Sequence, residues 1–330
     1  MAKLIQFIHP GVVHEPNYNI VKNQQLPCHY EWNKGNGHKR KFVEGEGEYL
    51  TGSIGKWQIN STKTLRYWCE AEWNTNCKQI VHHPSSPQLP QFYHTFVSKR
   101  QEKPGNNGLG TDPYIFGDYF KYVICRQIKN SSLQNLSQDD IILFGSCKMN
   151  SSKQFDFYID TVFVVEKRLT EIHLDKNPSK SIVNTYTGIS KDYYRRTLSR
   201  LVLPTTSSNS CTTNTTSGCQ ASISMTSRCG NSNKTTNLQS KTVSLYFGKM
   251  YSQSKQLFSF VPIMINLPAY SLPVLNYLNV QSNNQYKNGI SSNLTRGIKI
   301  TEIDKPVDVW QDIVRSFTNN GYSLGVHFPE

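Results

Sequence analysis

Residues 114–166 decide the fold class of this chain; they read YIFGDYFKYVICRQIKNSSLQNLSQDDIILFGSCKMNSSKQFDFYIDTVFVVE. Three runs of apolar, β-branched or aromatic residues occur here, at 120–128, 141–144 and 155–165. Polar turn-forming residues separate the runs, which is typical of strands in a sheet or a small barrel. We therefore predict an α+β protein with a mainly antiparallel, barrel-like core and two or three peripheral helices.

The length of 330 residues allows one elaborated domain or two. We predict a single domain over residues 1–330, with a β-rich core at about 1–170 and a basic C-terminal part at about 190–330. Residues 205–240 are rich in Ser, Thr and Asn with almost no large apolar side chains. This composition predicts a mobile insertion.

Composition also indicates a compartment. No apolar run approaches the roughly 18–20 residues that a membrane span needs, and the start, MAKLIQFIHPG, does not read as a signal peptide. The eight cysteines include no C-x-x-C pair, so we expect free thiols and no zinc site. We expect a cytoplasmic protein with no membrane partner, no metal and no cofactor, unless an enzyme activity uses Mg²⁺.

The formal charge of +13 is unevenly distributed. Between Asp192 and Glu302 there is no acidic residue, whereas eleven lysines and arginines fall in that interval. A block of this length that carries only positive charges favours a polyanionic partner, most simply nucleic acid. A solvated basic loop region is the alternative, and no basic amphipathic helix supports membrane-surface binding.

Further candidate contacts with nucleic acid are basic or aromatic. Residues 33–42 are expected to form a Gly-bounded loop, and its basic side chains either clamp a phosphate backbone or are simply exposed. The predicted helix at 191–202 has Ser190 as its N-cap and carries basic residues on the face opposite its apolar stripe. The phosphate-binding candidates are Lys39, Arg40, Lys41, Arg195, Arg196 and Arg200, and the base-stacking candidates are Trp68, Trp73, Tyr114 and Phe116.

Carboxylates and histidines give an enzyme alternative. Glu70 and Glu72 share one face of the predicted strand 65–73, where they either bind a metal or form the charged solvent face of an edge strand. Asp160 interrupts an apolar strand, so it needs a structural partner or a chemical task. With His38, these three are the catalytic candidates; His9 and His14 are further base or ligand candidates.

The C-terminal helix is the clearest single element. Asp304 is its predicted cap, and Pro306 fits the first turn. Its apolar stripe comprises Val307, Trp310, Ile313, Val314 and Phe317. This pattern predicts a helix that serves the core, followed by a strand at 322–328.

The pattern Leu133-x-x-Leu136-x-x-x-Asp140, followed by IILFG, resembles the start of a strand in PUA-like barrels, the group that includes the EVE and ASCH domains. The likeness covers roughly residues 114–166. The whole chain is also similar to a bacterial protein family without an established activity, over the HPG start, HKRKF, WCEAEW, TDPYIFGDYF, SFVP and the C-terminal helix. The EVE/ASCH resemblance implies a PUA-like barrel that recognises a nucleotide or modified base, in DNA modification or anti-phage defence.

Three motifs of other classes are absent from the sequence, namely G-x-x-x-x-G-K-[ST], G-x-G-x-x-G and H-E-x-x-H. We therefore predict a DNA- or RNA-binding or nucleotide-binding protein. A nucleotide- or nucleic-acid-processing enzyme, and a protein-interaction component of a defence or toxin system, are the alternatives.

Overall fold

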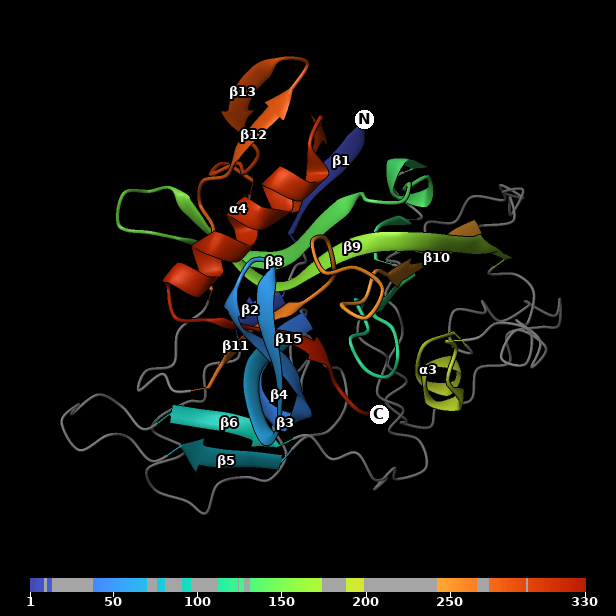
Figure 1. The fold of residues 1–330 in the computed structure, drawn as a ribbon, viewed down its shortest axis with the longest axis vertical. Helices are drawn as coiled ribbons and strands as arrows, with labels where there is room; N and C mark the ends of the chain where they lie inside the picture. The colour runs from blue at the N-terminus through green and yellow to red at the C-terminus, as the bar shows by residue number, and fades with distance from the viewer. Residues whose placement is uncertain are drawn as a thin grey trace, which may run out of the picture.

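The computed structural model describes the chain in segments with gaps between them. They are residues 1–8, 11–13, 38–69, 76–80, 91–95, 112–123, 125–127, 131–173, 188–198, 242–265, 273–294 and 296–330. Within these segments the protein is mostly β-structure in mainly antiparallel sheets (Figure 1). The predicted antiparallel β-rich architecture is confirmed, although helices contribute less than an α+β fold implies.

The first sheet has six strands in the order β14-β1-β8-β9-β10-β7. They are β1 (Ala2–Ile8), β7 (Lys121–Tyr122), β8 (Ile141–Met149), β9 (Phe155–His173), β10 (Thr242–Gly248) and β14 (Gly297–Ile303). β1 runs parallel to β8, and the other neighbouring pairs are antiparallel. Because β1 pairs with β14, strands from opposite ends of the sequence lie side by side.

The second sheet has seven strands, with β15-β11-β4-β3-β6-β5 as its main path. They are β2 (Gly11–Val13), β3 (His38–Ser53), β4 (Lys56–Cys69), β5 (Asn76–Ile80), β6 (Gln91–Thr95), β11 (Val261–Met264) and β15 (Ser323–His327). β3 and β4 form a long hairpin, β2 pairs with β3, and β15 pairs with both β11 and β3.

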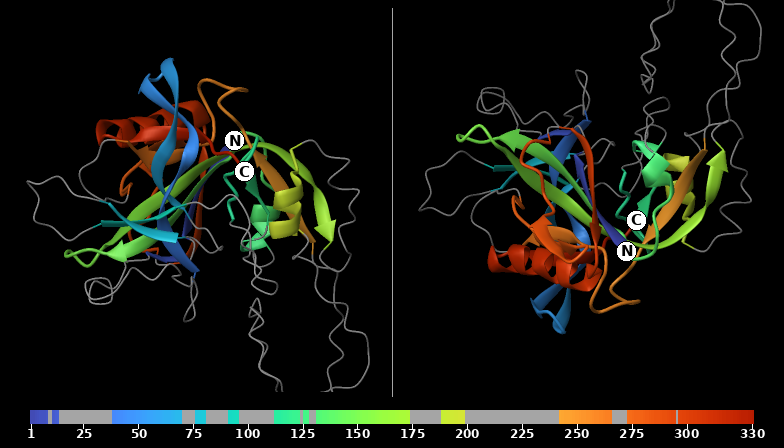
Figure 2. Two further views of the ribbon diagram at one scale, coloured as in Figure 1. Left: turned by 90° about the horizontal axis from the view of Figure 1, so that it is seen from below. Right: turned by 90° about the horizontal axis from the view of Figure 1, so that it is seen from above.

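A separate small hairpin consists of β12 (Asn279–Ser282) and β13 (Gln285–Asn288). It stands at the edge of the molecule, beyond helix α4 (Pro306–Asn319) (Figure 1). The short helix α3 (Lys191–Arg196) lies on the other side of the molecule from α4 (Figure 2).

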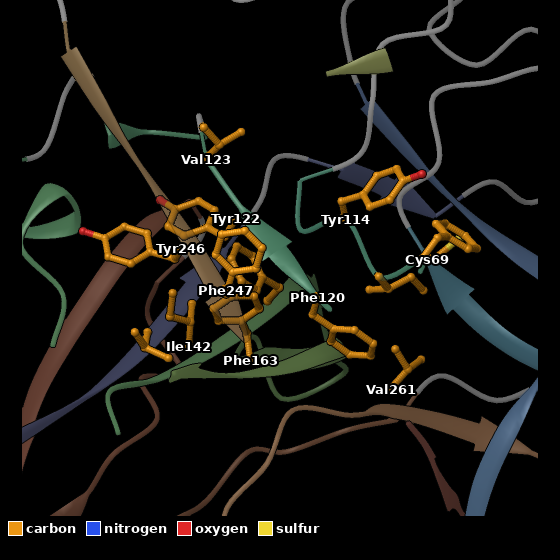
Figure 3. Packing of buried hydrophobic residues seen from close by; sticks show 14 of the residues in the cluster. Cys69, Tyr114, Phe120, Tyr122, Val123, Ile142, Phe163, Tyr246, Phe247 and Val261 are labelled. Carbon is orange, nitrogen blue, oxygen red and sulfur yellow. The ribbon is translucent and has the colours of Figure 1, made fainter. Parts of the chain in front are cut away.

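Both faces of the first sheet's central strands are buried. In β1, Ile5 and Phe7 enter one hydrophobic cluster, whereas Leu4 and Ile8 enter a second one. The first cluster is rich in aromatic side chains; the rings of Tyr122 and Tyr246 stack within it with centroids 5.9 Å apart (Figure 3). Burial on both faces explains why IILF in β8 is a continuous apolar run rather than an alternating one.

Helix α4 packs on the second cluster. Trp310 is fully buried, its ring lies 4.6 Å from that of Phe258, and its indole N–H donates to the Phe258 carbonyl at 2.8 Å. Pro306 occupies the first turn as predicted. The N-cap residue, however, is Lys305, whose side chain makes no capping hydrogen bond, so the predicted cap at Asp304 is wrong.

The ends of two predicted elements differ from the structure. Ser190 caps α3 as predicted, because its Oγ accepts a hydrogen bond from Tyr193 N at 3.0 Å, but the helix ends at Arg196 rather than at residue 202. The predicted strand 120–128 is reduced to β7. The Asp112 carboxylate accepts the backbone N–H groups of Val123 and Cys125, at 2.9 and 2.6 Å, which turns the chain out of the ladder.

One expectation for the first third of the chain is also wrong. Residues 38–41, expected in a loop, begin strand β3, where His38, Lys39 and Arg40 pair with β2. In β4, Arg66 and Tyr67 pair with β11 as well as with β3, whereas Glu70 and Glu72, for which an edge strand was one alternative, lie outside the described residues. The predicted mobile insertion at 205–240 lies outside the described residues.

Candidate nucleic-acid interface

Three of the four predicted stacking residues are core side chains. Trp68, Tyr114 and Phe116 expose 1%, 3% and 2% of their surface. The Trp68 ring packs 5.5 Å from that of Phe42, and the Tyr114 ring lies 4.8 Å from that of Tyr193. A base needs an exposed ring face to stack on, so the prediction that these three side chains stack a base is wrong for this structure.

Of the predicted acid and base groups, Asp160 alone has a side chain that the structure describes. Asp160 is 3% exposed within β9. The side chains of His38, Lys39, Arg40, Lys41, Arg195 and Arg196 are not described, although their backbone lies in β3 and α3. His9, His14, Glu70, Glu72, Trp73 and Arg200 lie outside the described residues.

Lys121 is the most unusual buried group in the region that the sequence singled out. Its ammonium donates to the carbonyls of Phe116 and Tyr119, at 3.3 and 2.9 Å. It also lies 5.3 and 5.1 Å from the ring centroids of Tyr114 and Tyr193. Burial lowers the pKa of Lys121 to about 8. Because only 1% of it is exposed, this amine is part of the core rather than a contact for a large ligand.

Exposed aromatic side chains occur instead at the β12–β13 hairpin. Tyr277 and Tyr286 are 65% and 69% exposed. Buried and exposed residues alternate along β12, where Val280 and Ser282 are buried, and Tyr277 continues the exposed set. Tyr286 pairs directly with Gln281, so both side chains lie on the solvent side of the hairpin with Tyr277.

The hairpin is held in place by its turn and its base. Asn283 and Asn284 have φ values of 51° and 61°, the left-handed conformation that a two-residue type I′ turn requires. At the base, Asn288 Oδ1 accepts the N–H groups of Leu278 and Ile290, at 2.9 and 3.0 Å. The tyrosines therefore project from a fixed support.

Cationic side chains lie on this hairpin and at β14. Lys287 belongs to β13 and Lys299 to β14, Arg296 directly precedes β14, and Arg126 approaches Gly297 at the start of β14. The Lys299 ammonium donates to the Asn288 carbonyl at 3.0 Å, which ties β14 to the base of the hairpin. A Cβ on Gly297 would lie 3.5 Å from Arg126 Nη1, so the Arg126 guanidinium covers the face of β14 on which Lys299 also lies, two residues further on.

These charges lie close together without a paired acid. Partial burial lowers the pKa of Lys299, and the positive charge of Lys287 lowers it further. Within the described segments, no carboxylate lies within 4.0 Å of the cationic groups of Arg126, Lys287, Arg296 or Lys299. The Asp304 carboxylate accepts a hydrogen bond from the backbone N–H of Asn284, in the turn of the hairpin, at 3.5 Å. Lysines held together in this way favour a bound anion.

The sequence carried a signal for this hairpin that the polar composition of residues 282–292 obscured. NVQS and QYKN alternate in polarity around Asn283-Asn284, a two-residue turn between short strands. A tyrosine at a polar position of such a strand predicts an exposed ring. Lys287, Arg296 and Lys299, by contrast, belong to the acid-free block between Asp192 and Glu302 that the charge count identified.

No family model, curated protein or solved structure matches this chain. In the segments that the structure describes, no three His, Cys, Asp or Glu side chains gather as metal ligands would. Nor does any helix in those segments have the length and apolarity of a membrane span.

Proposed function

We propose that this protein binds nucleic acid, with phosphates on the basic surface formed by Arg126, Lys287, Arg296 and Lys299. The observation that carries the proposal is the lysine pair at the base of the hairpin: Lys299 donates to the carbonyl of Asn288, the residue after Lys287, and no described carboxylate lies within 4.0 Å of either ammonium. A phosphate group between the two would relieve their repulsion and accept charge-assisted hydrogen bonds.

The sequence supports a broader contact area. Three of the four basic residues, Lys287, Arg296 and Lys299, belong to a block of 109 residues, 193–301, that contains no acid, so long-range repulsion of a polyanion is weak there. We propose that Arg195, Arg196 and Arg200 in the same block, and Lys39, Arg40 and Lys41 in the N-terminal third, add phosphate contacts. Contacts of this kind supply affinity and position rather than base specificity.

We also propose the finer features that the resemblance and the composition indicate. A PUA-like barrel rests on the resemblance over residues 114–166, which lie outside the four strands β3, β4, β11 and β15 that pair in a closed order. Recognition of a modified base, a defence context and a cytoplasmic location rest on the resemblance and the composition.

Fluorescence anisotropy with short labelled oligonucleotides of mixed sequence, as DNA and as RNA, tests the proposal. At about 50 mM salt the wild-type protein should bind, and the double variant K287Q/K299Q should bind about tenfold or more weakly. The matched control is K56Q/K63Q, which removes the same charge from two exposed lysines of the β3–β4 hairpin. Equal losses in both variants would show a net-charge effect and contradict a site at β14.

A further inference from the structure

We infer that the β12–β13 hairpin is a stacking platform for single-stranded nucleic acid, on which Tyr277 and Tyr286 hold unpaired bases. The inference rests on the proposed nucleic-acid binding and specifies the form of nucleic acid. It concerns different side chains from those that carry the phosphate contacts, so the two can fail separately.

Both tyrosine rings are exposed to solvent. The large aromatic side chains of the two core clusters are buried, whereas Tyr277 and Tyr286 leave about two thirds of their surface in solvent. An exposed tyrosine contributes little to folding, and its flat ring is suited to stacking on a base. The ordered turn and base of the hairpin fix the backbone that carries both rings.

The spacing of the two rings suits a strand of several nucleotides. Tyr286 lies opposite Gln281, four residues beyond Tyr277, which places the rings about 13 Å apart along the hairpin. Successive nucleotides of a stacked strand rise about 3.4 Å, so this spacing spans several nucleotides of one strand. The amide of Asn279, between the rings, and that of Gln281, beside Tyr286, lie on the same solvent side and can hydrogen-bond to base edges.

The cationic side chains lie on the other side of the hairpin from the two tyrosine rings. Lys287 pairs with Val280, on the opposite face from Tyr286, and Lys299 contacts the hairpin base through Asn288. A single strand that crosses the hairpin edge could place bases against the tyrosines and phosphates against the lysines. Proteins that bind single strands share this arrangement, in which aromatic rings stack on the bases and neighbouring cations contact the phosphate backbone.

The rings favour a single strand over a duplex because stacking uses the face of a base. In a duplex the neighbouring base pairs cover these faces, and only edges and phosphates are accessible. A two-stranded ribbon also fits the major groove of a duplex, which it would read with polar side chains. Competition between single-stranded and duplex DNA of the same sequence therefore separates the two modes.

The experiment measures the affinity of wild-type protein and four variants for a labelled single strand, with unlabelled single strand or duplex as competitor. The variants are Y277A/Y286A, Y277F/Y286F, K287Q/K299Q and K56Q/K63Q. Wild type should prefer the single strand. Y277A/Y286A should lose about tenfold or more of that affinity and little of the duplex affinity, whereas Y277F/Y286F, which keeps both rings, should retain wild-type binding.

Three results would overturn the inference. If Y277A/Y286A binds the single strand as wild type does while K287Q/K299Q is impaired, the phosphate surface stands and the stacking platform fails. If Y277F/Y286F loses as much as the alanine variant, the hydroxyl groups rather than the rings make the contact. If wild type binds no nucleic acid at all, the proposed function fails, and the inference with it.

Discussion

At the scale of single residues, Lys121 shows what the interior of this protein does to a charge. Its pKa is about 8, against an ordinary value of 10.5, because burial disfavours the ammonium more than the charges of Glu330 and Asp118 favour it. Between these two pH values the unfolded chain holds a proton that the folded protein has lost, so this residue makes the free energy of unfolding rise with pH.

The substitution Lys121→Met keeps most of the side-chain length and removes the charge. Burial of the lysine costs on the order of 3 kcal/mol below pH 8, and this cost vanishes as the pH approaches 10.5. Urea denaturation of wild type and variant at pH 7 and pH 9.5 should therefore show wild type gaining stability relative to the variant at the higher pH. A difference that stays constant between the two pH values would show that Lys121 is not desolvated as described.

Asp112 shows why the strand predicted at 120–128 ends early. The Asp112-Pro113 pair predicts a turn, and the 5% exposed carboxylate accepts two backbone N–H groups that would otherwise extend a strand. The same contact explains an error, because apolar residues after Lys121 read as strand until this long-range partner is known. Local patterns do not show which distant side chain satisfies a backbone donor.

At the scale of elements, the turn of the β12–β13 hairpin supports the proposed interface. Asn284 has a φ of 61°, which asparagine and glycine tolerate and a β-branched residue does not. Asn284→Val should distort the hairpin at a cost of roughly 1–3 kcal/mol and weaken binding to a single strand, since both tyrosines depend on the hairpin. Asn284→Gly should preserve binding, as measured by the same anisotropy assay. Wild-type affinity in the valine variant would show that the hairpin is not part of the interface.

Strong periodic patterns predicted elements well. β8, β9, β15 and the apolar stripe of α4 follow the sequence, because continuous apolar runs and helical spacing reflect burial directly. Faces were harder to predict. In β4, Leu65, Tyr67 and Cys69 alternate onto one face and are buried; Trp68 on the other face is buried as well, because the second cluster covers it. A two-sided burial of this kind depends on strand neighbours that are far away in sequence.

At the scale of the whole molecule, the two ends of the chain meet in one sheet, and this pairing builds the candidate interface. β1 holds β14 in the first sheet, while β12 and β13 dock beside β14 through Lys299 and Asn288. The sequence predicted the basic block but neither the exposed tyrosines nor the approach of Arg126, which comes from a segment far from β14. Charge is visible in composition, whereas its arrangement beside exposed rings follows from topology.

The salt dependence of nucleic-acid binding tests the central claim most directly. For wild type and K287Q/K299Q, the logarithm of the association constant for a labelled single strand is measured against the logarithm of salt concentration, from about 50 to 200 mM. A protein that holds phosphates at these lysines should show a linear decrease with salt, and the variant should have a slope shallower by about 1.4, or roughly 0.7 for each lost contact. Parallel lines for the two proteins, or no binding by wild type at about 50 mM salt, would contradict the claim.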